Sequence, residues 1–273
     1  MKELSYQKCF IKAFTLMVKN IYTFTKALYI PALGIGLIMA VCNMIHNTAS
    51  IEAKTVCIII ATIADLYLLN VMIVTIKKMF DSYYISEPHY LPTLSTIKNI
   101  KWSLNKSLTP FSLFFTYLAI ICIICFTTWL MIHKSLWWGF LLTPIIYLIV
   151  PQTISIFSCI TDDLTYLKAL KKGWKDSHKQ FGKVWMLQFV CGIIFIAFAL
   201  LASLPLIILN IYFNISANEI LMGDEVIIPT YVHILLFILT VILTALISIF
   251  TTYWTLANLY LRKSQEDEMA SKS

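Results

Sequence analysis

The sequence predicts an all-α membrane protein, a six-transmembrane-helix bundle with three amphipathic interfacial helices on the cytoplasmic side. Three observations predict this fold class. Of the 273 residues, 59% are apolar and only 13% are charged, whereas an ordinary soluble domain has about 25% charged residues. Apolar runs close to or above the ~20 residues that span a bilayer recur along the whole chain. Lysine and arginine gather in alternate segments between these runs.

Six apolar runs are expected to span the membrane: residues 27–45, 55–76, 110–132, 136–160, 184–211 and 228–256. The last two are longer than the hydrocarbon core requires, so tilt or protrusion at one end is expected. Prolines in the fourth and fifth runs each remove a backbone donor and are expected to kink their helices. The runs and their connections form one membrane domain, residues 1–260, followed by a polar cytoplasmic tail, residues 261–273.

The distribution of basic residues predicts the orientation of the chain. Of 21 lysine and arginine residues, 19 lie in the two terminal segments and in residues 77–109 and 161–183. The other set of connections holds only Lys54 and Lys134. Because positively charged segments stay in the cytoplasm, both termini are expected on the cytoplasmic side of the membrane. An even number of spans is therefore required, and six satisfies it.

The cytoplasmic segments 4–26 and 164–183 are predicted to be amphipathic helices, and residues 96–108 a weaker third. In each, apolar side chains recur at steps of three and four residues opposite a lysine row, which is typical of helices in the membrane interface. Thr161, Asp162 and Asp163 supply a start signal for the second helix. The lysines expected to contact anionic lipid headgroups, at about 1 kcal/mol each, are Lys8, Lys12, Lys19, Lys168, Lys172, Lys175 and Lys179.

Two of these segments are also alike as sequences. Residues 5–14 align without gaps on residues 165–174, sharing a tyrosine and two lysines at the same spacing. This predicts a threefold repeat, residues 4–76, 94–160 and 163–256, in which each unit is an interfacial helix followed by two spans. Every unit keeps the same orientation, unlike the inverted repeats of many transporters.

Residues 169–174 (Ala-Leu-Lys-Lys-Gly-Trp) and 181–185 (Phe-Gly-Lys-Val-Trp) carry a resemblance to a known family. The C-terminal part of the chain, from about residue 164, resembles the membrane domain of bacterial glycerophosphodiester phosphodiesterases and related six-span inner-membrane proteins. Their last span tends to end in a Leu-Tyr-Tyr-Asp-Leu-Arg-like run, whereas residues 259–262 here read Leu-Tyr-Leu-Arg and lack the aspartate. The resemblance implies a fold more than a function, because the catalytic barrel of the fused family members is absent here.

Polar residues inside the predicted spans are candidates for a functional site. Asp65 is the one formal charge near the middle of a span, where a carboxylate costs about 3 kcal/mol on insertion scales. It is therefore expected to contact an ion, proton or substrate, or else to form a hydrogen bond between helices. Asn70 and Gln152 complete this candidate intramembrane polar site, and for Gln152, Gln188 and Asn210 an interhelical hydrogen bond is the expected role.

Histidine and cysteine give weaker signals. His46, His133 and His233 lie at the outer ends of spans, but no H-x-x-x-H spacing accompanies them, so no metal or other cofactor is expected. Most of the seven cysteines lie inside apolar runs, as small hydrophobic residues do. Cys42 and Cys57 flank one short outer loop, so a disulfide bond between them is an alternative to two free thiols.

No phosphate-binding loop or nucleophile elbow is present in the sequence. The expected function is therefore a non-enzymatic envelope or lipid-associated role. A small transporter or channel using Asp65, and an integral enzyme acting on lipid headgroups, are the alternatives. The expected partners are anionic membrane lipids and another membrane protein or a second copy of the chain. Nucleic acid is not expected, because the lysines are spread over membrane-adjacent helices.

Overall fold

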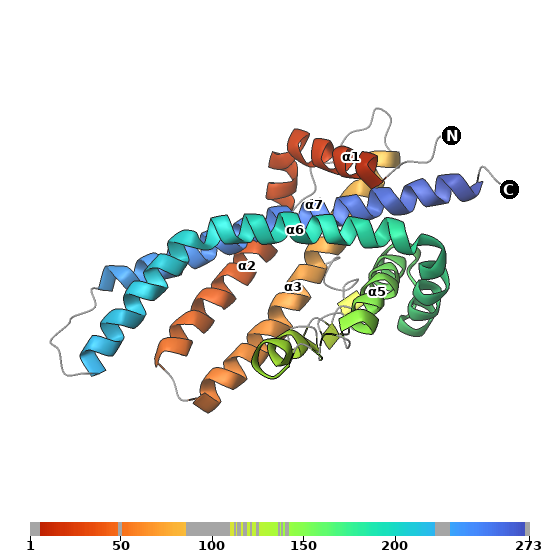
Figure 1. Ribbon diagram of the computed structural model, residues 1–273. Helices are drawn as coiled ribbons and strands as arrows, with labels where there is room; N and C mark the ends of the chain where they lie inside the picture. Colours follow the sequence, from red (N-terminus) through yellow and green to blue (C-terminus); the bar gives the residue numbers. More distant parts are fainter. Residues whose placement is uncertain are drawn as a thin grey trace.

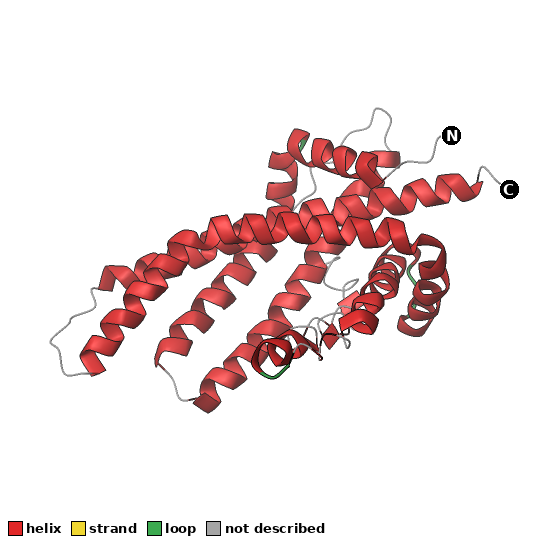
Figure 2. Cartoon of the chain, viewed as in Figure 1, coloured by secondary structure: helices red, strands yellow, loops and turns green. Residues whose placement is uncertain are grey.

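The computed structural model describes residues 6–48, 51–85, 142–221 and 230–270, together with part of residues 110–139. These residues are helical apart from short turns (Figure 2). The named helices are α1 (Tyr6–Lys19), α2 (Ile21–Thr48), α3 (Ile51–Ile85), α5 (Leu142–Asp162), α6 (Tyr166–Leu221) and α7 (Thr230–Ala270).

Among the described residues, four helices are long and apolar enough to cross a membrane. The qualifying stretches are Ile21–Cys42, Glu52–Tyr84, Tyr166–Leu209 and Tyr231–Ser264. Large apolar side chains point outward from them, and Ile60 and Leu201 are 62% and 71% exposed. Apolar surface on this scale is expected where lipid rather than water surrounds the helices. The helical class and the first, second, fifth and sixth predicted runs are thereby supported; α5 covers most of the fourth run.

The helices pack along one another around α7, which contacts α1, α2, α3 and α6 (Figure 1). Helix α2 approaches α7 closely at Gly36, where an added Cβ would lie 3.2 Å from the Cα of Val241. Small residues at crossings allow this close approach in membrane bundles. The largest buried cluster lies near the ends of α3 and α7, where Met72, Ile76 and Leu256 are fully buried.

The first predicted amphipathic helix is shorter than residues 4–26. Helix α1 ends at Lys19, the chain turns at Asn20, and α2 starts at Ile21. The side-chain amide of Asn20 donates to the carbonyl oxygen of Leu16 at 3.0 Å, and asparagine is a residue that ends helices well. Helix α1 lies across the end of the bundle (Figure 1), and its Phe10 ring is 5.8 Å from that of Tyr253.

The second predicted amphipathic helix is not a separate element. Residues 166–183 begin the continuous helix α6, and they pack antiparallel against α5. The close approach occurs at Gly173, where a Cβ would lie 2.5 Å from the carbonyl oxygen of Pro151. Tyr147 stacks on Phe181 with centroids 4.8 Å apart. The face that packs against α5 carries the small buried residues Ala169, Gly173 and Ser177. Leu167 and Trp174 of the predicted apolar stripe are instead 74% and 44% exposed, so most of this stripe does not face protein within the described residues.

The predicted start signal at residues 161–163 is also wrong. Thr161 and Asp162 end α5, and Asp163 has a positive φ of 50°. The carbonyl of Thr165 instead accepts the Ala169 N–H at 2.9 Å, so Thr165 opens α6. The third predicted amphipathic helix, residues 96–108, lies outside the described residues, and the threefold repeat stays a prediction.

Candidate functional site

Four polar side chains from three helices meet where α5 ends. Arg262 of α7 donates from Nη1 to the hydroxyl of Ser158 at 2.8 Å and from Nη2 to both carboxylate oxygens of Asp162, at 2.7 Å to Oδ1. Lys172 of α6 donates to Oδ2 of the same carboxylate at 2.6 Å. Ser158 and Asp162 are one turn apart on α5 and so share a face. These four residues form what we call the Asp162 cluster.

The cluster is partly shielded from solvent. The side chains of Arg262, Asp162 and Lys172 are 15%, 26% and 41% exposed. Partial burial on its own raises the pKa of Asp162, but the hydrogen bond from Lys172 and the charge of Arg262 outweigh it, so the pKa lies below the usual value. The carboxylate is therefore ionised at neutral pH and holds two cationic side chains from different helices.

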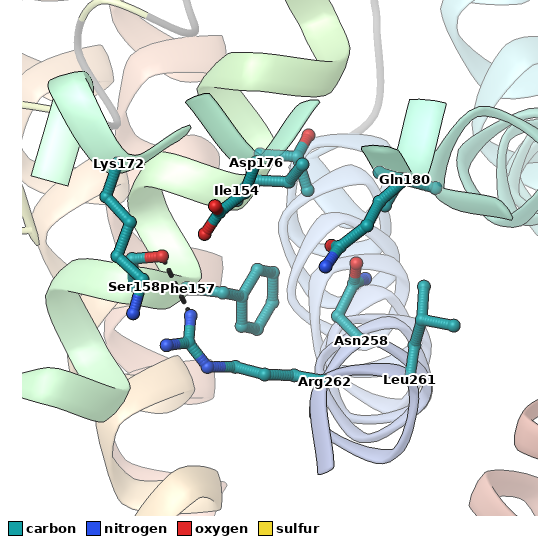
Figure 3. Close-up of a pocket in the computed structure, with 11 residues that line it drawn as sticks. Ile154, Phe157, Ser158, Lys172, Asp176, Gln180, Asn258, Leu261 and Arg262 are labelled. Atoms are coloured by element: carbon teal, nitrogen blue, oxygen red, sulfur yellow. Dashed lines mark hydrogen bonds between the residues drawn. The ribbon is translucent and has the colours of Figure 1, made fainter. Parts of the chain in front are cut away.

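A small cavity of about 80 Å³ adjoins the cluster between α5, α6 and α7. Figure 3 shows Asp176, Gln180 and Asn258 around it, with Arg262 reaching across to Ser158. A cavity of this size holds a few water molecules, so it is too small for a lipid headgroup. Polar and apolar side chains from all three helices line it.

A larger polar cleft of about 310 Å³ lies on the other side of the Asp162–Arg262 pair. Helix α3 contributes Lys77 and Asp81, which pair at 2.7 Å. Helix α7 contributes Lys263, whose Nζ lies 3.6 Å from the ring centroid of Tyr84. The ends of α3, α5 and α7 thus converge at one end of the bundle, in a polar region that carries more basic than acidic side chains.

A second hydrogen-bonded network joins α6 to α7 beside the cavity. The amide nitrogen of Gln188 donates to Oδ1 of Asn258 at 2.9 Å, and its oxygen accepts from Nε1 of Trp254 at 2.7 Å. The interhelical role expected for Gln188 is therefore observed. With Arg262, these α7 residues occupy positions 254, 258 and 262, so one face of α7 makes the polar contacts of both networks.

The predicted intramembrane residues do not form one site in the described part of the chain. Gln152 donates from Nε2 to the carbonyl oxygen of Leu113 at 2.7 Å, which is the interhelical bond expected of it. Asn70 is fully buried and donates to the carbonyl oxygen of Leu66 at 2.9 Å. Among the described residues, Oδ1 of Asn70 and Oδ1 of Asp65 are buried without a hydrogen-bond partner. The two lie on different faces of α3, being five positions apart.

The predicted headgroup lysines divide into two groups. Lys172 differs from the others, because its ammonium pairs with Asp162 and its side chain lines the small cavity. The others have exposed side chains: Lys8, Lys12 and Lys19 on α1 and Lys168, Lys175 and Lys179 on α6.

Helix α1 presents three distinct faces. One face is buried against the bundle through Cys9, Ala13 and Leu16. The opposite face exposes Ile11 and Phe14, which are 66% and 56% exposed. The lysine row of α1 borders this exposed apolar face, since Lys8 and Lys12 lie on the adjacent side of the helix.

The structure describes the side chains of two of the three outer histidines, His133 and His233. His133 lies against Trp129, with ring centroids 5.0 Å apart, and the side chain of His46 lies outside the described residues. No group of three or more potential metal ligands occurs among the residues whose positions are described.

Sequence reasoning missed the Asp162–Arg262 pair, which joins residues 100 positions apart. The available signal was the recurrence of polar residues at steps of four in otherwise apolar stretches: Ser158 and Asp162 on α5, and Asn258 and Arg262 on α7. Comparisons with protein-family models, curated proteins and solved structures each found no match.

Proposed function

We propose that this chain is an integral protein of a bacterial inner (plasma) membrane that binds anionic lipid headgroups through α1 and has a non-enzymatic role in the envelope. Both termini lie in the cytoplasm, and six spans cross the bilayer. The observation that carries the proposal is the outer surface of α1, an exposed apolar face bordered by lysines.

The proposed orientation is supported by where the basic segments lie. The end of α3, the start of α6 and the end of α7 carry Lys77, Lys172 and Arg262, and all three residues line the two polar cavities at one end of the bundle. Because positively charged segments stay in the cytoplasm, this end faces the cytoplasm. The end of α2 and the start of α3 lie at the other end.

The faces of α1 suit a helix that rests on the bundle and dips into the lipid interface. Ile11 and Phe14 are 66% and 56% exposed, so removing the rest of each side chain from water would contribute about 1–2 kcal/mol of the roughly 1.5–3 kcal/mol for complete burial. Each bordering lysine adds about 1 kcal/mol near an anionic surface. The buried face, held by Ala13 and Leu16, fixes the helix so that these side chains enter the interface together.

Lipid retention tests the proposal. Lys8→Gln, Lys12→Gln and Lys19→Gln are combined in one variant, and the protein is purified from mixed phosphatidylglycerol and phosphatidylethanolamine bilayers. Native mass spectrometry should show preferential phosphatidylglycerol adducts on the parent and a clear loss in the variant. The control carries Lys54→Gln and Lys134→Gln at the opposite end. Equal adduct loss in the control, or none in the triple variant, would refute α1 as the binding surface.

A small transporter is the second candidate, and the buried, unpartnered Oδ1 of Asp65 among the described residues favours it. Asn at this position keeps size and hydrogen bonding but removes the titratable group. If the envelope role is correct, Asp65→Asn and Asp65→Leu insert like the parent and change no flux. A proton- or cation-dependent flux in proteoliposomes that is present in the parent and absent in Asp65→Asn would place transport first.

A further inference from the structure

Two cysteine side chains meet at the end of the bundle opposite the Asp162 cluster. Cys42 lies near the end of α2 and Cys57 near the start of α3, and their Sγ atoms are 3.0 Å apart. A disulfide bond is about 2.0 Å long, so closing this gap needs an approach of about one ångström. The Sγ of Cys42 is also 3.5 Å from the carbonyl oxygen of Cys57.

The packing of α2 against α3 fixes this pair. An added Cβ on Gly34 of α2 would lie 3.0 Å from a methyl group of Leu68 on α3, so the two helices are in close contact below the cysteines. Other described cysteines have different surroundings: Cys9, Cys159 and Cys191 are buried, and Cys122 is exposed on another segment. Cys42 and Cys57 are therefore close because α2 packs against α3, and not simply because the chain contains several cysteines.

We propose that Cys42 and Cys57 form a native disulfide on the outer side of the membrane. This rests on the proposed orientation, which puts the end of α2 and the start of α3 outside, but not on lipid binding by α1. Disulfides persist in oxidising compartments and are rare in the cytosol. Each of the two thiols therefore lies close to the other, and on the outer side of the membrane the disulfide between them would persist.

The bond forms by thiol–disulfide exchange with a disulfide oxidant of the envelope. One cysteine thiolate attacks a sulfur of the oxidant and releases a thiol, and the second thiolate then attacks the mixed disulfide. Two thiols lose two protons and two electrons to become one disulfide, and the oxidant's disulfide takes them up as two thiols.

The disulfide would fix the outer separation of α2 and α3. The two helices line an open apolar cleft of about 780 Å³ at this end, and Cys42 and Cys57 are part of its wall. The bond also closes the loop between residues 42 and 57. Spreading of the two helices at the cleft is thereby restricted.

Thiol trapping in cells tests the proposal. Cells expressing the full chain are quenched with acid and blocked with N-ethylmaleimide, and the purified protein is digested without reductant for mass spectrometry. The parent should give a linked peptide containing Cys42 and Cys57, with neither cysteine alkylated. The link should disappear in both Cys42→Ser and Cys57→Ser and persist in the matched control Cys122→Ser.

Alkylation of both cysteines in the parent would overturn the proposal, and diamide treatment of membranes then identifies the failed step. If diamide links the pair, the thiols are adjacent but do not lie on an oxidising side, so the orientation is wrong. If diamide does not link them, the α2–α3 contact is wrong and the orientation is unaffected. The lysine variants of α1 report on lipid binding in either case.

Discussion

Arg262 and Asp162 are expected to stabilise the bundle through a measurable coupling. Arg262→Gln leaves Asp162 paired with Lys172 alone, and Asp162→Asn removes the carboxylate from both cationic side chains. The double variant lacks both charges of the pair. A double-mutant cycle built from these three variants therefore isolates the interaction between α5 and α7.

The exposure of the two side chains sets the expected magnitude. Exposed ion pairs contribute about 0.2–1 kcal/mol, whereas breaking a buried pair costs about 3–5 kcal/mol. At 15% and 26% exposure, Arg262 and Asp162 lie between these limits, and the guanidinium also binds Ser158. We expect a coupling of about 2 kcal/mol, roughly 30-fold in the folding equilibrium at about 1.4 kcal/mol per tenfold change.

Reversible unfolding in sodium dodecyl sulfate–detergent mixed micelles, followed by circular dichroism, measures the coupling. The matched control is a cycle on Lys77 and Asp81, which pair at 2.7 Å within the single helix α3. That pair should couple by only about 0.3–0.5 kcal/mol, because it joins no two helices. If the Arg262–Asp162 coupling is as small as the control, the cluster does not hold the helices together.

Three further predictions use the same unfolding measurement. The folded-state pKa of Asp162 lies below its ordinary value of 3.8, so the stabilisation by the cluster is complete above pH 3.8 and is lost as the pH falls through the lowered pKa. Asp162→Asn should remove this part of the acid dependence of stability, and an unchanged acid profile would argue against the ion pair. Gly173→Ala should destabilise the fold by about 1–3 kcal/mol because its Cβ meets backbone atoms of α5. Gly192→Ala, with no atom within 4 Å of its Cβ, should be neutral or stabilising. If both variants change the free energy of unfolding equally, close packing at Gly173 is refuted. Gln188→Leu should cost about 1 kcal/mol, since two interhelical hydrogen bonds at roughly 0.6 kcal/mol each are lost, and a neutral result would mean that Asn258 and Trp254 find other partners.

The membrane-crossing helices were predictable because one local property determines them. About 20 consecutive apolar residues suffice to identify a span. The runs at 27–45, 55–76 and 184–211 each lie within a long described helix, and α7 covers the run at 228–256 from Thr230 onward. Helix ends were less predictable. The first amphipathic helix was predicted to continue to Lys26 because the lysine spacing continues smoothly beyond Lys19. In the structure α1 ends at Lys19, before the turn at Asn20.

The Asp162 cluster was less predictable because its partners are distant in sequence. Asp162 was interpreted as a helix start, since acids favour that position, but it ends α5 and binds a side chain 100 positions away. Gln152 and Gln188 were assigned to interhelical bonds from their type and location, and the structure supplies their partners, Leu113 and Asn258. Residue type thus predicted that a bond would form, but tertiary packing alone decides with which helix.

The lysines of α6 show where periodicity stops being informative. Lys172 and Lys179 are seven residues apart, so they lie within about 20° of one another around an ideal helix. Yet Lys179 is exposed, while Lys172 pairs with Asp162 and lines the small cavity. The difference arises along the helix axis, because α5 ends and Arg262 of α7 arrives at the level of Lys172. Lysines of one row on α6 therefore have different surroundings, because Lys172 joins helices and Lys179 is exposed.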